Sequence, residues 1–416
     1  MRLLIVDVNF DYKNIIYRQF YNYLSYNNEV DFFWPGYVTR DTLENGILEF
    51  IDKGKYDALI LGVYFVYSAN IDGMHYNAYS VHRNVIPYYK VNDAYVCCHN
   101  IYEQLKVING IIKIFYYYED TALSSAGDCR VCEELIQSGF YLMGDPPQIM
   151  SRYSQAKLEK HPLLTNSMLE LIVRNEEYYI PLTCLAISYH EIFHNCYTSR
   201  EYEWCVPGNR AKKYYPMREV IYNELYEKGY KCWSDDQYKE LSVNSIEKKR
   251  MERYVFRNIE ERLLSRILGK NNYICSYPKI DYVAACREQY LESMRNTRAV
   301  FTDGGIMEVL VRKYFEACAC GALLVGMKVA GLEAFGFRDG YNCRIVNEEN
   351  REAVIKDIMK DNCNNEKIAA RGQKLILGKH MFTNRAISFV QTIDAIRNKC
   401  YKGAYWYEGD YIIKKC

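Results

Sequence analysis

The chain has 416 residues, of which 49% are hydrophobic and 25% charged, and its formal net charge is +1. This length suffices for two or three domains, and the composition is ordinary for a globular protein. The balanced charge does not favour nucleic acid or an anionic membrane surface as the main partner. The first apolar run is too short for a signal peptide and ends at Asp7, and no window approaches the length of a membrane span. We therefore expect a cytoplasmic protein without a transmembrane segment.

The 16 cysteines are spread along a long chain that has no export signal. This distribution favours reduced thiols over a disulfide framework. Cys129 and Cys132 form a C-x-x-C pair, but no second pair follows at the spacing of a zinc finger. We interpret them as ordinary thiols near the start of a helix.

Buried-strand patterns occur in the N-terminal half at residues 3–8, 58–63 and 111–118, and a helix is predicted from residue 12 to about 24. Short apolar runs separated by helical stretches are typical of a parallel, doubly wound sheet. No G-x-G-x-x-G follows the first strand, which argues against a dinucleotide-dependent oxidoreductase.

A polar stretch at residues 152–177 predicts the passage to a second lobe, where strands and helices alternate again. The strands are predicted at residues 203–206, 231–234, 273–276, 299–302, 322–325 and 344–346, and the helices at 216–228, 284–296, 351–360 and 382–398. The charged segment 239–262 is interpreted as a solvated helix. We predict an α/β protein with two Rossmann-like lobes, residues 1–190 and 191–395, facing across a cleft. Residues 396–416 are expected to return to the first lobe.

Residues 301–326 are the most informative stretch. A predicted strand runs into Gly304 and Gly305, and the next helix is expected to carry Glu308 and Glu316 before Gly321 ends it. In such a β–turn–α–β unit the helix begins at the sheet edge where ligands bind, and its N-terminus favours phosphate. Eight residues span just over two helical turns, so the two acids should lie on broadly the same side, about 12 Å apart. They could hold two ends of one elongated ligand.

This stretch also carries a resemblance to a known family. Glu308 and Glu316, with seven residues between them and the run 317–321 after them, resemble the E-x7-E…A-x-G signature of GT-B glycosyltransferases. Within that fold the chain is most similar to the bacterial spore-maturation-type group, also called glycosyltransferase family 1. Further similarity lies at residues 206–218, 331–340 and 372–386, so that the resemblance covers roughly residues 200–395.

The resemblance implies a GT-B fold and the transfer of a sugar from a UDP- or GDP-sugar donor. The acceptor could be a protein, a glycan or a cell-wall polymer bound to the first lobe, while the donor sits in the second. In similar enzymes the second acid, here Glu316, holds the ribose, and the first, here Glu308, contacts the donor sugar in retaining members. Residues 309–311 read Val-Leu-Val where Gly-Phe-Gly is common in the family.

A donor with two phosphates needs cations and backbone N–H groups around them. The candidates are Arg312 and Lys313 beside the acids, and Arg210, Lys212, Lys213 and Arg218 after the strand that ends near Gly208. We expect the loop with Gly208 and Arg210 to approach the pyrophosphate, and Arg218, then Arg210 and Lys313, to stabilise the departing diphosphate. No Asp-x-Asp motif occurs in the chain, which favours a reaction without a bound metal.

Two other functions remain open. His190-Glu191-Ile192-Phe193-His194 is a formal H-E-x-x-H motif, which on a helix could bind zinc and activate a water, with Glu219 or Glu224 as a third ligand. The chain could also be a non-catalytic nucleotide- or sugar-binding protein. In the first lobe, one of three histidines near predicted strand ends could contact the donor sugar or act as a base: His75, His82 or His99.

Overall fold

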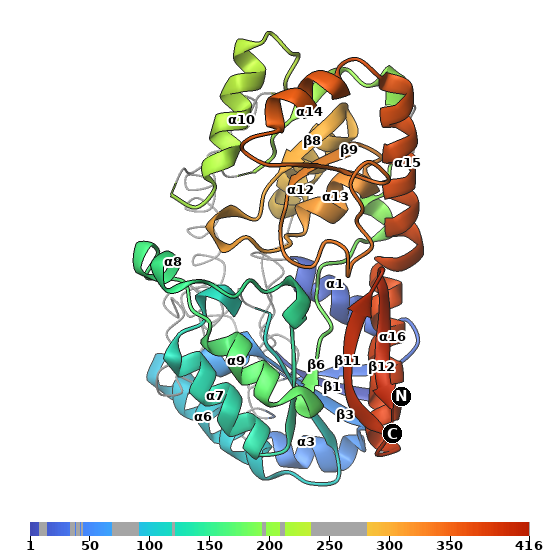
Figure 1. The fold of residues 1–416 in the computed structure, drawn as a ribbon. Helices are drawn as coiled ribbons and strands as arrows, with labels where there is room; N and C mark the ends of the chain where they lie inside the picture. Colours follow the sequence, from blue (N-terminus) through green and yellow to red (C-terminus); the bar gives the residue numbers. More distant parts are fainter. Residues whose placement is uncertain are drawn as a thin grey trace, which may run out of the picture.

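The computed structural model describes residues 1–7, 15–33, 38, 42, 45–68, 91–118, 121–193, 197–208, 213–233 and 281–415. These residues form two α/β lobes, each built on a parallel sheet, and a C-terminal hairpin (Figure 1). The predicted pair of Rossmann-like lobes is therefore confirmed. The strand expected at 273–276 and the charged helix at 239–262 lie outside the described residues.

The first lobe has a six-stranded parallel sheet in the order β2-β1-β3-β4-β5-β6. Its strands are β1 (Arg2–Val6), β2 (Glu29–Phe32), β3 (Ala58–Gly62), β4 (Ile112–Tyr116), β5 (Phe140–Met143) and β6 (Tyr179–Ile180). All five residues of β3 and the last four of β1 are buried. Strands with both faces buried belong in the centre of a helix-covered parallel sheet, and this is where β1 and β3 lie.

The described helices of this lobe are α1 (Ile15–Leu24), α3 (Ile47–Gly54), α4 (Val63–Ser68), α6 (Val91–Val107), α7 (Ala126–Gln137), α8 (Gln155–Lys160) and α9 (Ser167–Arg174). Helix α7 begins at a capping box, in which the Ser125 side chain accepts from the Asp128 N–H and the Asp128 carboxylate accepts from the Ser125 N–H. Cys129 and Cys132 lie on this helix, and both thiols are free.

The second lobe has a four-stranded parallel sheet in the order β10-β9-β8-β7. Its strands are β7 (Tyr202–Cys205), β8 (Thr297–Thr302), β9 (Leu323–Met327) and β10 (Arg344–Val346), and its helices are α10 (Pro216–Glu227), α12 (Asp281–Arg295), α13 (Lys313–Ala319), α14 (Arg351–Ile358) and α15 (Asn362–Lys379). The strand expected at 231–234 is reduced to one isolated bridge between Cys232 and Trp204.

The C-terminal elements return to the first lobe. Helix α16 (Phe382–Arg397) contacts α1 and β4, although we expected residues up to 395 in the second lobe. The antiparallel hairpin of β11 (Tyr401–Tyr407) and β12 (Asp410–Lys415) lies beside it (Figure 1). Its Trp406 indole N–H donates to the Pro181 carbonyl at 2.7 Å, which ties the tail to the end of the first sheet.

The chain passes between the lobes near residue 187 and again near residue 381, and the two passages are hydrogen-bonded to each other. The Ile187 N–H donates to the His380 carbonyl, and the Phe382 N–H donates to the Ile187 carbonyl, both at 2.9 Å. The fully buried Arg385 adds a bond from Nη2 to the Leu185 carbonyl at 2.9 Å. The passages therefore form one connected joint.

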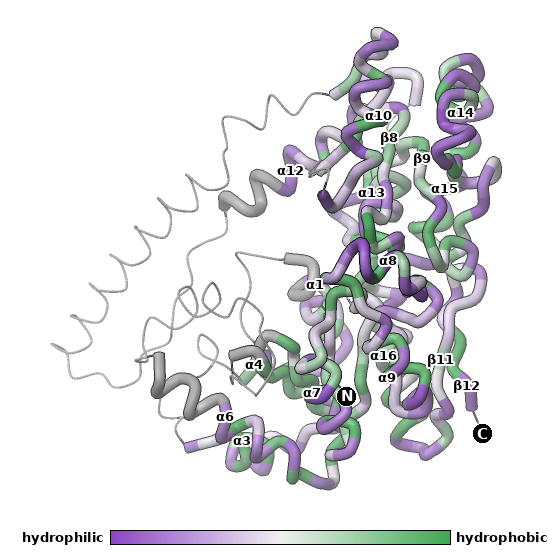
Figure 2. The backbone as a smooth tube through the Cα atoms, turned by 60° about the vertical axis from the view of Figure 1, so that its left-hand side comes forward, coloured by the Kyte–Doolittle hydropathy of each residue, from purple (hydrophilic) through white to green (hydrophobic). Residues whose placement is uncertain are grey.

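Hydrophobic packing is continuous through this joint. One buried cluster includes Leu4 and Ile60 of the first sheet and Phe315 and Leu324 of the second lobe. In Figure 2, β8 and β9 are mainly hydrophobic, whereas hydrophobic and hydrophilic residues alternate along the outer helices. Within the described part of the chain, no helix has the length and apolar character needed to cross a membrane.

Candidate functional site

The loop after β8 folds differently from the sequence prediction. Gly305–Met307 form a short 3-10 helix (η7), Glu308 follows in the left-handed conformation with φ 54°, and α13 begins only at Lys313. A Cβ on Gly304 would lie 2.5 Å from the Val309 carbonyl oxygen, so the chain doubles back on itself here. Glu308 and Glu316 are therefore not on one helix, and that prediction is wrong.

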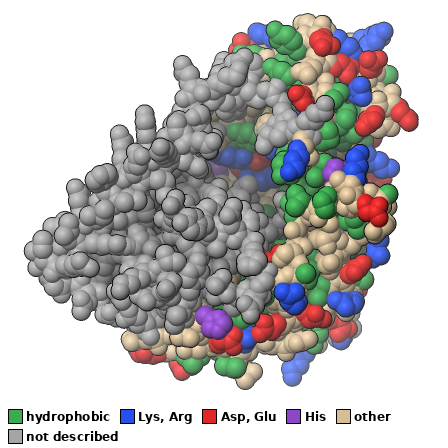
Figure 3. All heavy atoms as spheres, turned by 90° about the vertical axis from the view of Figure 1, so that its left-hand side faces the viewer, with side chains coloured by type: hydrophobic (Ala, Val, Ile, Leu, Met, Phe, Trp, Pro, Cys, Tyr) green, Lys and Arg blue, Asp and Glu red, His purple; other side chains and the backbone are tan. Residues whose placement is uncertain are grey.

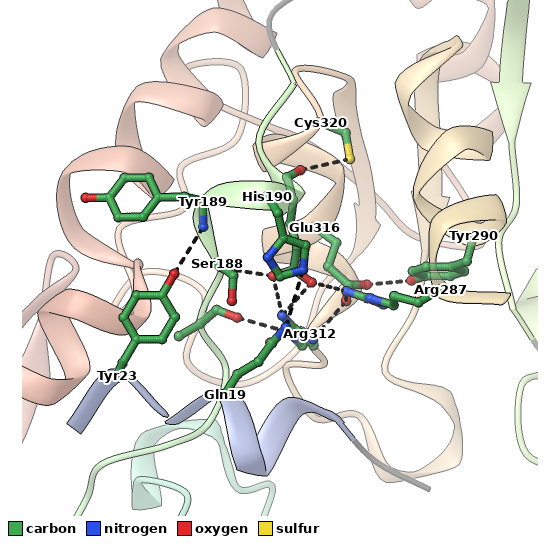
Figure 4. A network of polar contacts seen from close by, with 12 residues as sticks. Gln19, Tyr23, Ser188, Tyr189, His190, Arg287, Tyr290, Arg312, Glu316 and Cys320 are labelled. Atoms are coloured by element: carbon green, nitrogen blue, oxygen red, sulfur yellow. Dashed lines mark hydrogen bonds and ion pairs between the residues drawn. The ribbon is translucent and has the colours of Figure 1, made fainter. Parts of the chain in front are cut away.

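Glu316 points into a buried network of charges (Figure 4). Its side chain is only 3% exposed. Arg287 Nη2 donates to Oε1 and the Tyr290 hydroxyl donates to Oε2, both at 2.5 Å, and Arg312 Nη1 lies 3.5 Å from Oε1. Both carboxylate oxygens thus have a donor from α12.

Glu191, on the segment that joins the lobes, is the second acid of this network. Arg312 Nη2 donates to both oxygens of Glu191, at 2.6 and 2.8 Å, and Arg287 contacts the same carboxylate. The Ser188 N–H donates to Glu191 Oε2 at 2.8 Å, and Arg312 Nε donates to the Ala186 carbonyl at 3.0 Å. The network therefore joins the interlobe segment to α12 and α13.

The charges in the network keep both acids ionised. Burial alone would raise the pKa of Glu316, but Arg287, Arg312 and the Tyr290 hydroxyl outweigh it and hold that pKa at about 2. Burial likewise opposes ionisation of Glu191, yet Arg312 and Arg287 lower its pKa. Burial and the charge of Glu316 raise the pKa of Tyr290, so its hydroxyl remains a donor.

A second group of charges lies at the start of α13. Arg218 of α10 is buried and pairs through Nε with Asp303 Oδ1 at 2.6 Å. Gly208, three residues after the end of β7, meets Lys313 and Arg218: a Cβ there would lie 2.7 Å from Lys313 Cε and 3.7 Å from Arg218 Nη1. The structure thus brings Gly208, Arg218 and Lys313 together.

The surroundings of Lys313 disfavour its charged form. Burial, followed by the charge of Arg218, lowers the pKa of Lys313 to about 8, despite the opposing effect of Glu316 and Asp303. Among the described residues, no carboxylate lies within ion-pair distance of Lys313. An anion bound here would relieve the repulsion between Lys313 and Arg218.

Glu308 faces the first lobe. Its carboxylate, 57% exposed, lies 2.5 Å from Lys157 Nζ on α8. The Tyr153 hydroxyl donates to the Met307 carbonyl at 2.6 Å, and Ser151 Oγ donates to the Glu308 carbonyl at 3.1 Å. The loop that follows Gly304 and Gly305 is therefore held from the opposite lobe.

The described residues contradict the zinc-peptidase alternative. Residues Tyr189–Glu191 form a 3-10 turn (η4) that ends at Glu191, and no α-helix continues through Ile192 and Phe193. Two histidines can share one helix face only if that helix forms. The Glu191 carboxylate is bound by two arginines and cannot act as a base on water. Instead, the Ser188 N–H donates to the Glu191 carboxylate, and the 3-10 turn ends at Glu191.

Some sequence predictions cannot be placed. Arg210, Lys212, His75, His82 and His194 lie outside the described residues, and His99 is exposed on α6. In Figure 3, basic and acidic side chains are visible in a recess near the middle of the face shown.

Sequence reasoning missed Arg287 and Tyr290 and misassigned Glu191. Arg287 and Tyr290 are three residues apart on a predicted helix, which puts them on one face. Nothing in the sequence indicates that this face meets Glu316.

Comparison with known proteins gives a consistent result. Residues 253–391, one third of the chain, match the model of the glycosyl transferase-like family. Alr3699/HepE from Anabaena, in a complex with UDP and glucose, is 10% identical with a TM-score of 0.50, over 95% of this chain and 100% of that chain. Sucrose-phosphate synthase (tll1590) from Thermosynechococcus elongatus is 11% identical with a TM-score of 0.50, over 96% and 100%.

A search among curated protein sequences finds no match. The solved structures are too different in sequence to establish more than the fold, but they align over nearly the whole chain. The chain therefore has the two-lobed GT-B fold of glycosyltransferases, and its residues 253–391 carry a glycosyl transferase-like domain.

Proposed function

We propose that this protein transfers a sugar from a nucleoside diphosphate sugar, such as a UDP- or GDP-sugar, to an acceptor. The fold and the family match support a glycosyltransferase, and the Anabaena structure with this fold is a complex with UDP. The observation that carries the proposal is the pair of cations, Lys313 and Arg218, beside Gly208 at the first turn of α13.

This arrangement suits a diphosphate for three reasons. Lys313 has no carboxylate partner within ion-pair distance among the described residues, and the charge of Arg218 adds to the effect of burial in lowering its pKa. Gly208 has no side chain to fill the space against Lys313. A bound diphosphate would accept from these donors and restore the charge balance.

Lys313 and Arg218 also contribute to the chemical step in this proposal. As the bond between the anomeric carbon and the diphosphate oxygen breaks, negative charge grows on the leaving group, and Lys313 and Arg218 stabilise it. In this proposal these cations perform the leaving-group role, so the reaction needs no bound metal. Glu316 accepts from the ribose of the donor, and Arg312 keeps Glu316 ionised.

The proposal also includes retention of the anomeric configuration of the transferred sugar. It depends on Glu308, the first acid of the E-x7-E pair, which lies on its own turn before α13. The carboxylate is more than half exposed, so it is available to a sugar, and its ion-pair partner in the structure is Lys157. The narrower likeness to the spore-maturation group is part of the same proposal.

The lobes divide the work in this proposal. Residues 191–395 bind the donor, residues 1–190 present a protein, glycan or cell-wall acceptor, and residues 396–416 stay with the first lobe. We call residues 303–312, between β8 and α13, the donor loop. Contacts from Tyr153 and Lys157 to this loop support a closed arrangement, which would exclude water from the activated sugar.

A thermal-shift panel with UDP, GDP, ADP, TDP and CMP tests the proposal. We expect stabilisation by one of the nucleoside diphosphates, and its loss in Glu316→Gln but not in the exposed control Glu333→Gln. Donor turnover is then measured with the responding nucleotide sugar. Binding without any transfer or donor hydrolysis would indicate a non-catalytic binding protein, and no response to any nucleotide would contradict the proposal.

A further inference from the structure

Arg287 and Tyr290 place two hydrogen-bond donors on the two oxygens of Glu316, an N–H on Oε1 and an O–H on Oε2, each at 2.5 Å. Two donors on two oxygens is also the pattern that the 2′,3′-diol of a ribose presents to a carboxylate. We propose that Arg287 and Tyr290 compete with the ribose hydroxyls for the two oxygens of Glu316, and that a ribonucleotide binds by displacing them. This inference rests on the proposed function.

An exchange is required because the present partners of Glu316 close its carboxylate off from solvent. Its side chain is 3% exposed, and Arg312 Nη1 already lies 3.5 Å from Oε1. Two ribose hydroxyls can reach these oxygens only when Arg287 and Tyr290 both move away. Arg287, with 22% of its side chain exposed, is the more accessible of the two partners.

Glu191 makes the exchange possible. Arg287 Nη2 contacts the Glu191 carboxylate as well as Glu316, so it keeps a buried counter-ion when a ribose takes its place on Glu316. Glu191 is held by the Ser188 N–H at 2.8 Å and by Arg312 at 2.6 Å. A buried arginine without a counter-ion is strongly unfavourable. Glu191 is therefore a positioning residue of the donor site.

The exchange has two measurable consequences. Removing the Tyr290 hydroxyl should destabilise the nucleotide-free protein, because this hydroxyl donates to Glu316, but not the nucleotide complex, where ribose replaces it. Nucleotide affinity should therefore rise in Tyr290→Phe, by about three- to tenfold for one hydrogen bond. A 2′-deoxynucleotide can supply only one of the two donors, so UDP should bind more tightly than dUDP.

Isothermal titration of UDP and dUDP into the full chain tests the inference. The variants are Tyr290→Phe, Glu191→Gln, and Tyr226→Phe as a control, since Tyr226 is 71% exposed on α10. We expect about fivefold tighter UDP binding in Tyr290→Phe, and no change in Tyr226→Phe. Glu191→Gln should weaken UDP binding about tenfold, because Arg287 then has only Glu316 as a counter-ion.

The outcomes separate the two proposals. Unchanged or weaker UDP binding in Tyr290→Phe would overturn the inference and leave the proposed function standing, because a purely structural tyrosine cannot raise affinity when its hydroxyl is removed. No UDP or GDP binding by the unaltered protein would overturn both. If Glu191→Gln does not fold, Tyr290→Phe alone decides, since the phenylalanine ring keeps its packing against Arg287, 5.0 Å from the ring centroid.

Discussion

At the scale of single residues, Lys313 is a group whose charge changes just above neutral pH. Its folded pKa of about 8 lies below the usual lysine value of 10.5. Unfolding therefore takes up a proton between these values, and the charged Lys313 lowers the stability of the folded chain at pH 7. A bound diphosphate would reverse this effect and raise the pKa of Lys313.

The first prediction is a loss of UDP affinity as the pH rises through about 8. Below this pH Lys313 is protonated in both the free and the bound state, whereas above it binding must take up a proton. Phosphate itself is fully ionised above about pH 7, so it adds no dependence there. Titrations between pH 7 and 9.5 measure the effect, and Lys313→Gln should remove it. An equal pH dependence in that variant would contradict the role of Lys313.

Glu308 should affect the chemical step more than binding. We expect Glu308→Gln to lower kcat about 100-fold with little change in the UDP affinity, since the side chain is placed to meet the sugar and not the nucleotide. Stability should change by less than about 1 kcal/mol, because the Glu308 side of the ion pair with Lys157 is more than half exposed. Lys157→Gln, which removes the same ion pair, is the control. If both variants have the same kcat, Glu308 has no role of its own in transfer.

At the scale of elements, the loop after β7 fits against α13 because Gly208 has no side chain. We expect Gly208→Ala to weaken UDP binding at least tenfold, since its Cβ would push Lys313 Cε from a distance of 2.7 Å. Gly229→Ala is the matched control: its φ is also positive, at 73°, but nothing lies within 4 Å of its Cβ. Both variants should lose about 1 kcal/mol of stability from backbone strain, measured by urea unfolding. Equal UDP affinities in Gly208→Ala and Gly229→Ala would show that Gly208 is not part of the donor site.

Several elements were predictable from sequence because their signals are local. The apolar runs of β1, β3 and β8 are buried in parallel sheets, as their composition indicates. The helix expected to carry Glu308 failed because Gly304 packs against the backbone of Val309, a contact that helical spacing does not reveal.

The buried charge network was not predictable, because its contacts join residues far apart in the sequence. Glu316 and Glu191 are 125 residues apart, and the arginines that join them come from two different helical segments. The H-E-x-x-H pattern does not form the zinc-binding helix that it suggests, because Tyr189–Glu191 form a 3-10 turn in place of an α-helix. Long-range ion pairs depend on the packing of the lobes, which composition and periodicity do not specify.

At the scale of the whole molecule, the lobes meet on both sides of the donor loop. The joint near Ile187 and Met381 closes one side. On the other, Tyr153 packs with Ala122, Leu164 and Met307 in a small hydrophobic cluster across the lobes. The position of the donor loop is therefore coupled to the position of the first lobe.

This coupling predicts that Tyr153→Phe impairs a site it does not contact. The variant loses the bond to the Met307 carbonyl and should cost about 1–3 kcal/mol of stability. We also expect a higher KM for the donor, because the loop before α13 is less well held. Urea unfolding and donor kinetics measure both effects, with the exposed Tyr226→Phe as the control. Equal stability and KM in the two variants would show that the interlobe bond is unimportant.

The most direct test of the donor site is a calorimetric titration of UDP and GDP into the full chain and into Lys313→Gln. This variant removes a destabilised charge, so it should fold and melt at a higher temperature than the unaltered chain at pH 7. Lys356→Gln on α14, an exposed position, is the control. The account predicts one nucleotide per chain, with affinity lowered tenfold or more in Lys313→Gln and unchanged in Lys356→Gln. No binding of either nucleotide, or equal affinity in both variants, would contradict it.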